Sequence, residues 1–394
     1  MEFSKIEKLI DEYIDEIIEF RRDIHSHPEL GGNEVRTSQK IVEKLKKFSI
    51  DFKQNIGGYG VLGIIKGAPG KTILLRGDMD ALPLNEKNNL NFKSQNKNVM
   101  HACGHDMHSA ILLGTAIVLS KIKDSLNGNV KFMFQPNEEV SPIGGSKPMI
   151  EAGILENPNV DEAYGLHVFE LPTGKISLKP GVVNSKSDRI TIEIFGKSSH
   201  GSLPSEGKDA IIVAANLISS IQTIISRNLN SDETAIISIG TIEGGTKYNV
   251  ISDYVKLEGT IRTFNKATAQ KIRKRLETII DNICGAYDCQ GKLTYQDGYD
   301  FIYNDEILSN NVINSVSSIL GSENVIPQKK PVPVGEDFSY ISQKVPSVFL
   351  WLGTEGKDNK GMCTLHNPNF IADENSIRIG IKVFCKIVID SLNS

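Results

Sequence analysis

The stretch Ile73-Leu74-Leu75-Arg76-Gly77-Asp78-Met79-Asp80 places a short apolar run directly before two carboxylates. A second apolar run, Val130-Lys131-Phe132-Met133-Phe134, is followed by Asn137-Glu138-Glu139, and the apolar segment 110–122 separates the two runs. Strands that alternate with helices predict an α/β layer structure with a mostly parallel sheet. Ligands bind beyond the carboxyl ends of the strands in such sheets. The paired carboxylates are therefore expected at a binding site.

Between these runs lies Met100-His101-Ala102-Cys103-Gly104-His105-Asp106-Met107-His108, which combines a thiol, imidazoles and a carboxylate. A thiolate beside imidazoles indicates a metal site, although these residues alone suit zinc, iron, nickel or copper about equally well. Two isolated histidines add to the set: His167 follows a short strand at 163–166, and His366 lies in Thr364-Leu365-His366-Asn367-Pro368. Together with the paired glutamates, these residues offer enough ligands for two ions.

Each of these residues also has a purely structural interpretation. Asp78 and Asp80 could be turn or capping residues, because Asp is preferred in turns. A pair of glutamates is most often a solvated helix start, where carboxylates complement the helix dipole. Isolated histidines such as His167, His200 and His366 are more often structural. The conjunction of a Cys, a Glu and three His at strand ends and loops, beside a spare Glu, favours metal chemistry over these alternatives.

The composition is that of an ordinary globular protein. The 394 residues are 39% hydrophobic and 23% charged, which is enough chain for two domains. A net charge of -4, with Lys and Arg scattered among acids, predicts no nucleic-acid partner. No apolar run approaches the roughly 20 residues of a membrane helix, and the N-terminus predicts an amphipathic helix rather than a signal peptide. Five cysteines are odd in number and sparse, so we expect a cytoplasmic protein.

The pattern of the chain changes twice. From about Asn184, period-two alternation such as Arg189–Phe195 predicts strands covered on one face only. The α/β style returns after Asp300, and His366 lies in this return segment. If all the ligands share one site, the first domain is discontinuous, with residues 1–183 and 301–394 enclosing an inserted α+β domain of residues 184–300. The inserted domain is expected to contain helices at 209–225 and 266–286 and strands at 234–242, 254–262 and 292–295.

Five motifs closely resemble the amidohydrolases that include hippurate hydrolase, N-acetyldiaminopimelate deacetylase and the plant hydrolases of indole-acetyl amino acids. They are Arg76–Pro83, His101–Asp106, Phe134–Glu139, Gly335–Ser339 and Leu365–Pro368. The resemblance implies a zinc-exopeptidase-like co-catalytic metallopeptidase domain that carries two metal ions. It also implies that the inserted domain is a lid that mediates dimerisation, in a homodimer or a dimer of dimers.

The resemblance further implies the ligands of the two ions. Cys103 becomes a bridging thiolate, with Glu139 and His366 completing one ion and His105 and His167 completing the other. Mn²⁺ or Zn²⁺ is expected for both ions, and Ni²⁺ or Co²⁺ also suits these ligands.

The remaining glutamate of the pair, Glu138, is implied to be the general base that takes a proton from the attacking water. In the wider superfamily a His-x-Asp occupies the place of Asp78-Met79-Asp80. Because of this departure Asp78 need not bind metal, and Asp80 is expected to orient a ligand.

Other family positions fall in the inserted domain. His200 is implied to stabilise the oxyanion, either in its own subunit's site or in the partner's. Asn249 and Arg262 are implied to hold the α-carboxylate of the substrate, a role that suits the planar fork of Arg. Glu336 and Asp337 lie in a loop that the family keeps near the metals, where a structural role is about as expected as a catalytic one.

The predicted function is metal-dependent hydrolysis of the amide bond of N-acyl amino acids, with an N-acetyl, N-benzoyl or similar acyl group. A dipeptidase or carboxypeptidase would use the same metals and differ only in its pocket. A non-catalytic binding protein is expected to lack the general base, yet Glu138 is present. A structural zinc protein would keep a closed four-ligand shell, whereas five ligands and a spare base favour open coordination positions.

Overall fold

A computed structural model describes residues 3–394, and the chain divides into two compact units. Unit 1 contains Met1–Val183, Ile302–Lys330 and Asp337–Ser394, and unit 2 contains Asn184–Phe301 and Pro331–Glu336. The segment Pro331–Glu336 was expected in the first domain. It groups with unit 2 because Ser185 N donates to Val332 O at 3.0 Å.

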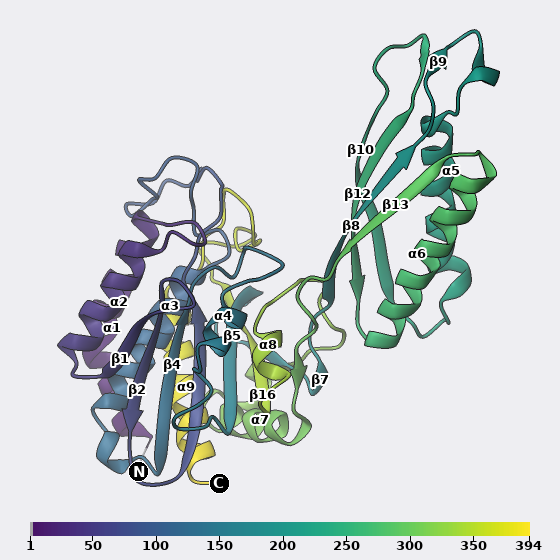
Figure 1. Ribbon diagram of the computed structural model, residues 1–394. Coiled ribbons are helices and arrows are strands. Elements are labelled where there is room, and N and C mark those ends of the chain that lie inside the picture. The colour runs from purple at the N-terminus through teal and green to yellow at the C-terminus, as the bar shows by residue number, and fades with distance from the viewer. Residues whose placement is uncertain (1–2) are drawn as a thin grey trace. The chain divides into compact units, whose positions relative to one another are not determined.

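Unit 1 is built on an eight-stranded sheet of the order β1-β2-β4-β3-β5-β16-β6-β15 (Figure 1). The predicted α/β class is confirmed, but the sheet is mixed: β4, β3, β5 and β16 run parallel in the centre, while β1 and β2 pair antiparallel. The near-continuous burial of β3 and β4 is typical of strands covered on both faces. The strand bounds are β1 Asp51–Ile56, β2 Gly60–Lys66, β3 Lys71–Asp78, β4 Gly128–Gln135, β5 Glu162–Pro172, β6 Ile176–Leu178, β15 Val325–Pro327 and β16 Ser347–Glu355.

Helices and short elements complete unit 1. Helix α3 is buried on all sides, because it lies on the sheet and is covered by α1 and α9. It begins at His105, so the Cys–His run leads directly into a helix fixed at the centre of the unit. The bounds are α1 Ser4–Ser26, α2 Val35–Lys47, α3 His105–Ser120, α4 Ser146–Glu151, α7 Glu306–Leu320, α8 Ser339–Ser342 and α9 Asn375–Leu392, with a ribbon of β7 Gly181–Val182 and β14 Tyr303–Asn304.

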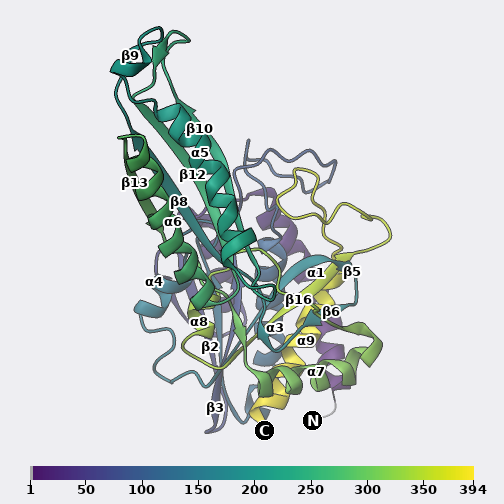
Figure 2. The same ribbon diagram turned by 90° about the vertical axis from the view of Figure 1, so that its right-hand side faces the viewer.

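Unit 2 is a four-stranded antiparallel sheet of the order β10-β12-β8-β13, with α5 and α6 side by side along one face (Figures 1 and 2). The predicted alternation is present in β8, where Ile190, Ile192 and Ile194 are buried. Asp209 and Asn265 cap the two helices through their side-chain oxygens. The bounds are β8 Lys186–Phe195, β10 Ala235–Gly244, β12 Tyr254–Thr263, β13 Gln290–Gln296, α5 Ala210–Thr223 and α6 Lys266–Ala286, with a ribbon of β9 Ser199–His200 and β11 Val250–Ile251.

One helical segment in the described part of the chain, Ala210–Asn228, is long and apolar enough to cross a membrane by length and composition alone. This differs from the expectation that no apolar run approaches that length. Val213, Leu217 and Ile221 on its inner side are buried in the core of unit 2. Core helices of globular proteins pass the same test, so the finding is weak evidence for a membrane span.

Candidate metal centre

Three of the predicted ligands meet where α3 and β5 approach each other. The ligand atoms of Cys103, His105 and His167 all lie within 4.8 Å of one another, and Cys103 Sγ is 3.4 Å from His167 Nε2. Gly104 has a φ of 81°, and a Cβ at this position would lie 2.4 Å from the side chain of Val168. Glycine therefore allows the tight turn that aims Cys103 and His105 at one point.

A second group shares the same thiol. The ligand atoms of Cys103, Glu139 and His366 also lie within 4.8 Å of one another, and Glu139 Oε1 is 3.2 Å from His366 Nε2. The loop that carries His366 is tied to the Cys–His run, because His366 N donates to Ala102 O at 2.8 Å. Cys103 thus lies between two groups of donors, each suited to one cation.

Glu138 belongs to a third group, in which its carboxylate lies within 4.8 Å of ligand atoms of His105 and Glu139. The turn before it is tied to the residue that directly precedes α2, because Asn137 N donates to Glu34 Oε1 at 2.7 Å. Asn137 has a φ of 64°, a left-handed conformation that Asn tolerates better than most residues. The buried Glu138 carboxylate is therefore fixed beside both groups of donors.

Asp80 connects the two groups. Its Oδ1 is 3.2 Å from His105 Nδ1, and its Oδ2 accepts the backbone N–H of Glu139 at 2.9 Å. Because Nδ1 of His105 faces Asp80, Nε2 is the nitrogen left for a cation, and this buried atom has no hydrogen-bond partner among the described residues. A buried nitrogen without a partner, beside a thiol and carboxylates, fits a metal ligand.

The electrostatics of the site favour positive charge. Burial lowers the pKa of His105, but the surrounding carboxylates, Asp78 foremost, outweigh it and raise this pKa to about 10. Burial, Glu139 and Glu138 raise the pKa of the Cys103 thiol well above its usual range. Burial and His108 lower the pKa of His167. The carboxylates thus attract a cation, and the thiolate form of Cys103 requires one.

Asp78 is engaged elsewhere. Its Oδ2 is 2.6 Å from Arg76 Nη1, and its Oδ1 is 2.5 Å from Nδ1 of His108. No role was predicted for His108, although its position three residues after His105 places both on one face of α3. Asp337 holds neighbouring segments together, because it accepts hydrogen bonds from Gln135 Nε2 at 2.7 Å and from Gly145 N at 3.0 Å.

The predicted residues of unit 2 fall in two places. His200 pairs with Val250 across the β9–β11 ribbon, and Gly201 N donates to Asn249 O at 2.8 Å, so His200 and Asn249 are neighbours. The exposed ring of His200 has Nδ1 2.7 Å from Ser202 Oγ, and the Asn249 Oδ1 has no hydrogen-bond partner among the described residues.

Arg262 lies toward the other end of the same unit. It hydrogen-bonds Ser187 Oγ near the start of β8. It lies eight positions along β12 from Tyr254, the residue at which the strand begins after the ribbon, and this offset corresponds to about 26 Å. The structure therefore brings His200 and Asn249 together within unit 2, and it keeps Arg262 apart from both.

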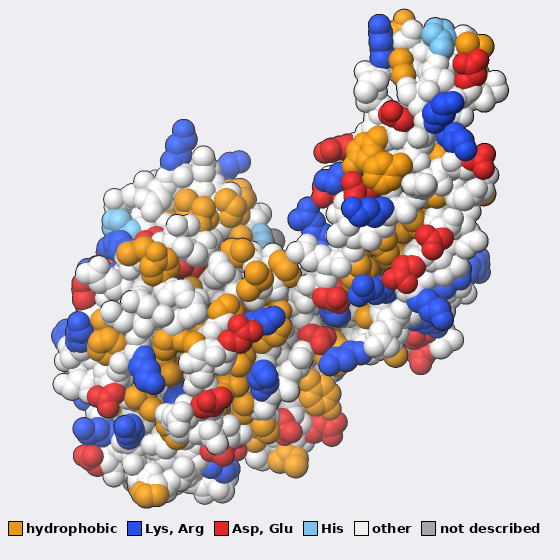
Figure 3. Space-filling model, in the orientation of Figure 1, with side chains coloured by type: hydrophobic (Ala, Val, Ile, Leu, Met, Phe, Trp, Pro, Cys, Tyr) orange, Lys and Arg blue, Asp and Glu red, His pale blue; other side chains and the backbone are white. Residues whose placement is uncertain are grey.

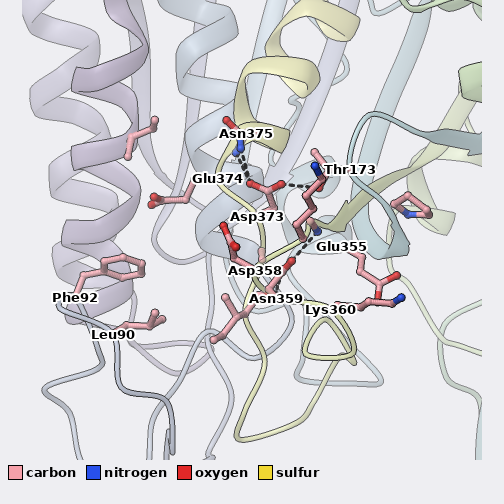
Figure 4. Close-up of a pocket in the computed structure, with 16 residues that line it drawn as sticks. Leu90, Phe92, Thr173, Glu355, Asp358, Asn359, Lys360, Asp373, Glu374 and Asn375 are labelled. Carbon is pink, nitrogen blue, oxygen red and sulfur yellow. Dashed lines mark hydrogen bonds between the residues drawn. The ribbon is translucent and has the colours of Figure 1, made fainter.

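A cavity of about 960 Å³ lies elsewhere in unit 1, between α1 and the segment 355–375 (Figure 4). Two of its acidic side chains have partners: Asp373 accepts from Thr173 Oγ1 at 2.8 Å, and Glu374 is 2.6 Å from Arg22 Nη2. The predicted site residues do not line this cavity.

Comparison with known proteins identifies the family of this chain. The sequence profile of Peptidase family M20/M25/M40 matches residues 74–390. Thermostable carboxypeptidase 1 of Saccharolobus solfataricus is 37% identical over 380 residues, which cover 96% of this chain and 95% of that protein. N-acetyldiaminopimelate deacetylase of Anoxybacillus flavithermus is 37% identical over 376 residues, which cover 94% and 96%. A crystal structure of a Bacillus subtilis protein, described as a dinuclear metal binding peptidase from the M20 family, has a TM-score of 0.84 and 33% identity and covers 97% of this chain and 99% of that one.

Proposed function

We propose that this chain, which belongs to Peptidase family M20/M25/M40, hydrolyses the amide bond of N-acyl amino acids and releases a carboxylic acid and a free amino acid. Membership of the family confirms the resemblance identified from the motifs and the class of amide-bond hydrolase. The observation that carries the proposal is the placement of Cys103 between two groups of metal donors, with Glu138 beside both.

Two divalent ions suit these donors. Cys103, His105 and His167 would hold one ion, while Cys103, Glu139 and His366 would hold the other. Mn²⁺ or Zn²⁺ is the expected metal, and Ni²⁺ or Co²⁺ fits the same donors. When bound, such ions would lower the pKa of the attacking water and polarise the carbonyl of the scissile amide.

Glu138 would move the proton. Its carboxylate is buried beside His105 and Glu139 and held by the turn at Asn137. It would take a proton from the attacking water and pass it to the nitrogen of the leaving amino acid. One water molecule balances the reaction. Its oxygen and one of its hydrogens complete the carboxylic acid as the C–O bond forms, and its other hydrogen, carried by Glu138, completes the amino group as the C–N bond breaks.

Unit 2 would supply the remaining contacts, with His200 at the oxyanion and Asn249 and Arg262 at the α-carboxylate. Because Arg262 lies about 26 Å along β12 from the end where His200 and Asn249 lie, one copy of unit 2 cannot place all three around one substrate. This separation supports a site completed by the partner subunit, with His200 and Asn249 acting in trans.

The surface of unit 2 supports a homodimer as well. Strand β10 is the edge of its sheet, and it exposes the apolar side chains of Ile236 and Ile242. Helix α5 exposes Ile211 and Ile212. Hydrophobic side chains gather among charged ones on the face of unit 2 seen in Figure 3. An unpaired edge strand beside exposed apolar side chains is a surface that a second copy of the same unit can cover.

The surface charge and the cysteines bear on the partners and the location of the protein. On the face seen in Figure 3, Lys and Arg are interspersed with Asp and Glu, an arrangement that favours a small-molecule substrate over nucleic acid. A cytoplasmic location is supported by the five cysteines, all of which are buried free thiols.

The test is a substrate screen with each metal. The purified protein, loaded with Mn²⁺, Zn²⁺, Ni²⁺ or Co²⁺, is assayed with N-acetyl, N-benzoyl and indole-acetyl amino acids, with N-acetyldiaminopimelate and with dipeptides. Release of amino acid from the N-acyl substrates is expected. Faster turnover of dipeptides would favour the alternative function of a dipeptidase or carboxypeptidase, which the 37% identical carboxypeptidase keeps open.

The variant Glu138→Gln separates the roles of base and ligand. It is expected to bind both ions and to lose about 10²–10⁴-fold in turnover, because the amide keeps the shape of the side chain and removes its basicity. Normal metal content with activity within about tenfold of the unmodified protein would contradict the assignment of the base.

A further inference from the structure

His108 is a fully buried histidine with both ring nitrogens engaged. Its Nε2 lies 2.9 Å from the backbone nitrogen of Val168, which can only donate, so Nε2 is the acceptor. The proton therefore resides on Nδ1 and is donated to Asp78 Oδ1 at 2.5 Å. Although His108, Asp78 and His105 together resemble a metal-ligand group, His108 cannot bind a cation without breaking one of these contacts.

Asp78 is itself held in a buried network. Its Oδ2 is 2.6 Å from Arg76 Nη1. Arg76 in turn donates from Nε to Gln135 Oε1 at 2.8 Å and from Nη2 to Asp337 Oδ1 at 2.9 Å. These side chains are fully buried, so the network fixes the carboxylate that orients His108.

His108 acts on His167 through one peptide unit. Val168 directly follows His167, and the Val168 N–H is the group that His108 accepts. The carbonyl of the same residue is 2.6 Å from His167 Nδ1, which leaves Nε2 of His167 facing Cys103. The His108 ring also packs against that of His167, with centroids 4.5 Å apart.

We propose that His108, oriented by Asp78, is a positioning residue for only one of the two ions, the ion held by Cys103, His105 and His167. The inference rests on the proposed function, because it requires a cation at that group of donors. The other group is held by different contacts. Glu139 N is bound by Asp80, and His366 N is bound by Ala102 O. Replacing His108 should therefore lower the affinity for one ion and leave the affinity for the other unchanged.

The test is a titration of the metal-free full-length protein with Zn²⁺, followed by calorimetry and by competition with a chromophoric chelator. The unmodified protein is expected to bind two ions. His108→Leu should bind one ion with unchanged affinity and the other about 10–100-fold more weakly, the usual effect of losing a group that orients a ligand. His108→Gln should recover most of this loss, because its carbonyl can accept the Val168 N–H and its amide can donate to Asp78.

Leu112→Ala is the matched control. Leu112 is buried on the same helix, one turn beyond His108. Its truncation should lower the melting temperature without changing either affinity. A His108→Leu variant that binds both ions normally, or that loses both ions to the same extent, would overturn the inference.

Asp78→Asn keeps the test decisive if His108→Leu does not fold. An amide at position 78 can donate to Nδ1, which would place the proton on Nε2 against the Val168 N–H. The same selective loss of one ion is expected, and normal binding of both ions would refute the inference. An unmodified protein that binds fewer than two ions would instead overturn the proposed function on which the inference rests.

Discussion

Asp80→Asn tests the link between the two groups of donors. The Asp80 carboxylate is buried, with one oxygen 3.2 Å from His105 Nδ1 and the other accepting Glu139 N–H at 2.9 Å. An Asn side chain has a single acceptor oxygen, so one of the two neighbours must face its NH₂ group. In either orientation the NH₂ group faces the N–H of one neighbour, His105 or Glu139, and the contact with that ligand is lost. The side chain must then shift, and the shift weakens its contact with the other ligand.

The expected size follows from these two contacts. Losing a group that orients a ligand typically costs about 10–100-fold in metal affinity, which corresponds to about 1.4–2.7 kcal/mol for each ion. Asp80→Asn should bind both ions more weakly, whereas His108→Leu should bind only one of them more weakly. The assay is metal titration of the metal-free protein, with Asp124→Asn as the control. Asp124 is exposed beyond the far end of α3, about 24 Å along the helix from His105.

Two results would contradict a role for Asp80 at both groups of donors. If Asp80→Asn binds both ions as tightly as the unmodified protein, then Asp80 does not orient the ligands. If only one ion weakens, then the carboxylate serves one group of donors, and the contact with the other is incidental. In either case the Asp124→Asn control should behave like the unmodified protein, because it removes the same charge far from the site.

Three further predictions concern the thiol, unit 2 and the stability of unit 1. Cys103→Ala should release at least one ion and abolish turnover, and a variant with two tightly bound ions by metal analysis would show that the thiol is incidental. If His200 acts in trans, mixing inactive His200→Ala with inactive Glu138→Gln subunits should restore activity, because some heterodimers then hold one intact site; if activity stays absent, His200 acts in cis. Lys131→Met should lower the free energy of unfolding by at least about 2 kcal/mol in urea titrations, because Lys131 Nζ donates to the carbonyls of Ile154, Glu156 and Pro158. A loss of stability no larger than that of the exposed control Lys66→Met would contradict this prediction.

Much of the fold could be predicted from periodicity. The alternation in Arg189–Phe195 predicts β8 because side chains of a strand face opposite sides, and the structure buries every second one. The expected helix at 266–286 matches α6. The antiparallel pairing of β1 with β2 was not predicted, because a short apolar run does not indicate whether the strand beside it runs parallel or antiparallel.

Residue identity already specifies the chemistry available to this protein: a thiol, histidines and paired carboxylates, most of them just after strands or at the start of a helix. His167 is different, because it lies inside β5 and not after a strand that ends at residue 166. Spacing alone does not indicate which histidine of the run His101–His108 is available to a cation, and it was the family resemblance that implied His105. His105 and His108 lie three residues apart on one helical face, so spacing treats them alike. The fold distinguishes the two histidines. Following β3, Asp80 contacts Nδ1 of His105 and leaves its Nε2 without a hydrogen-bond partner among the described residues, whereas Asp78 and the Val168 N–H of β5 engage both ring nitrogens of His108. A side chain's free lone pair depends on partners distant in the sequence, and only the fold places those partners.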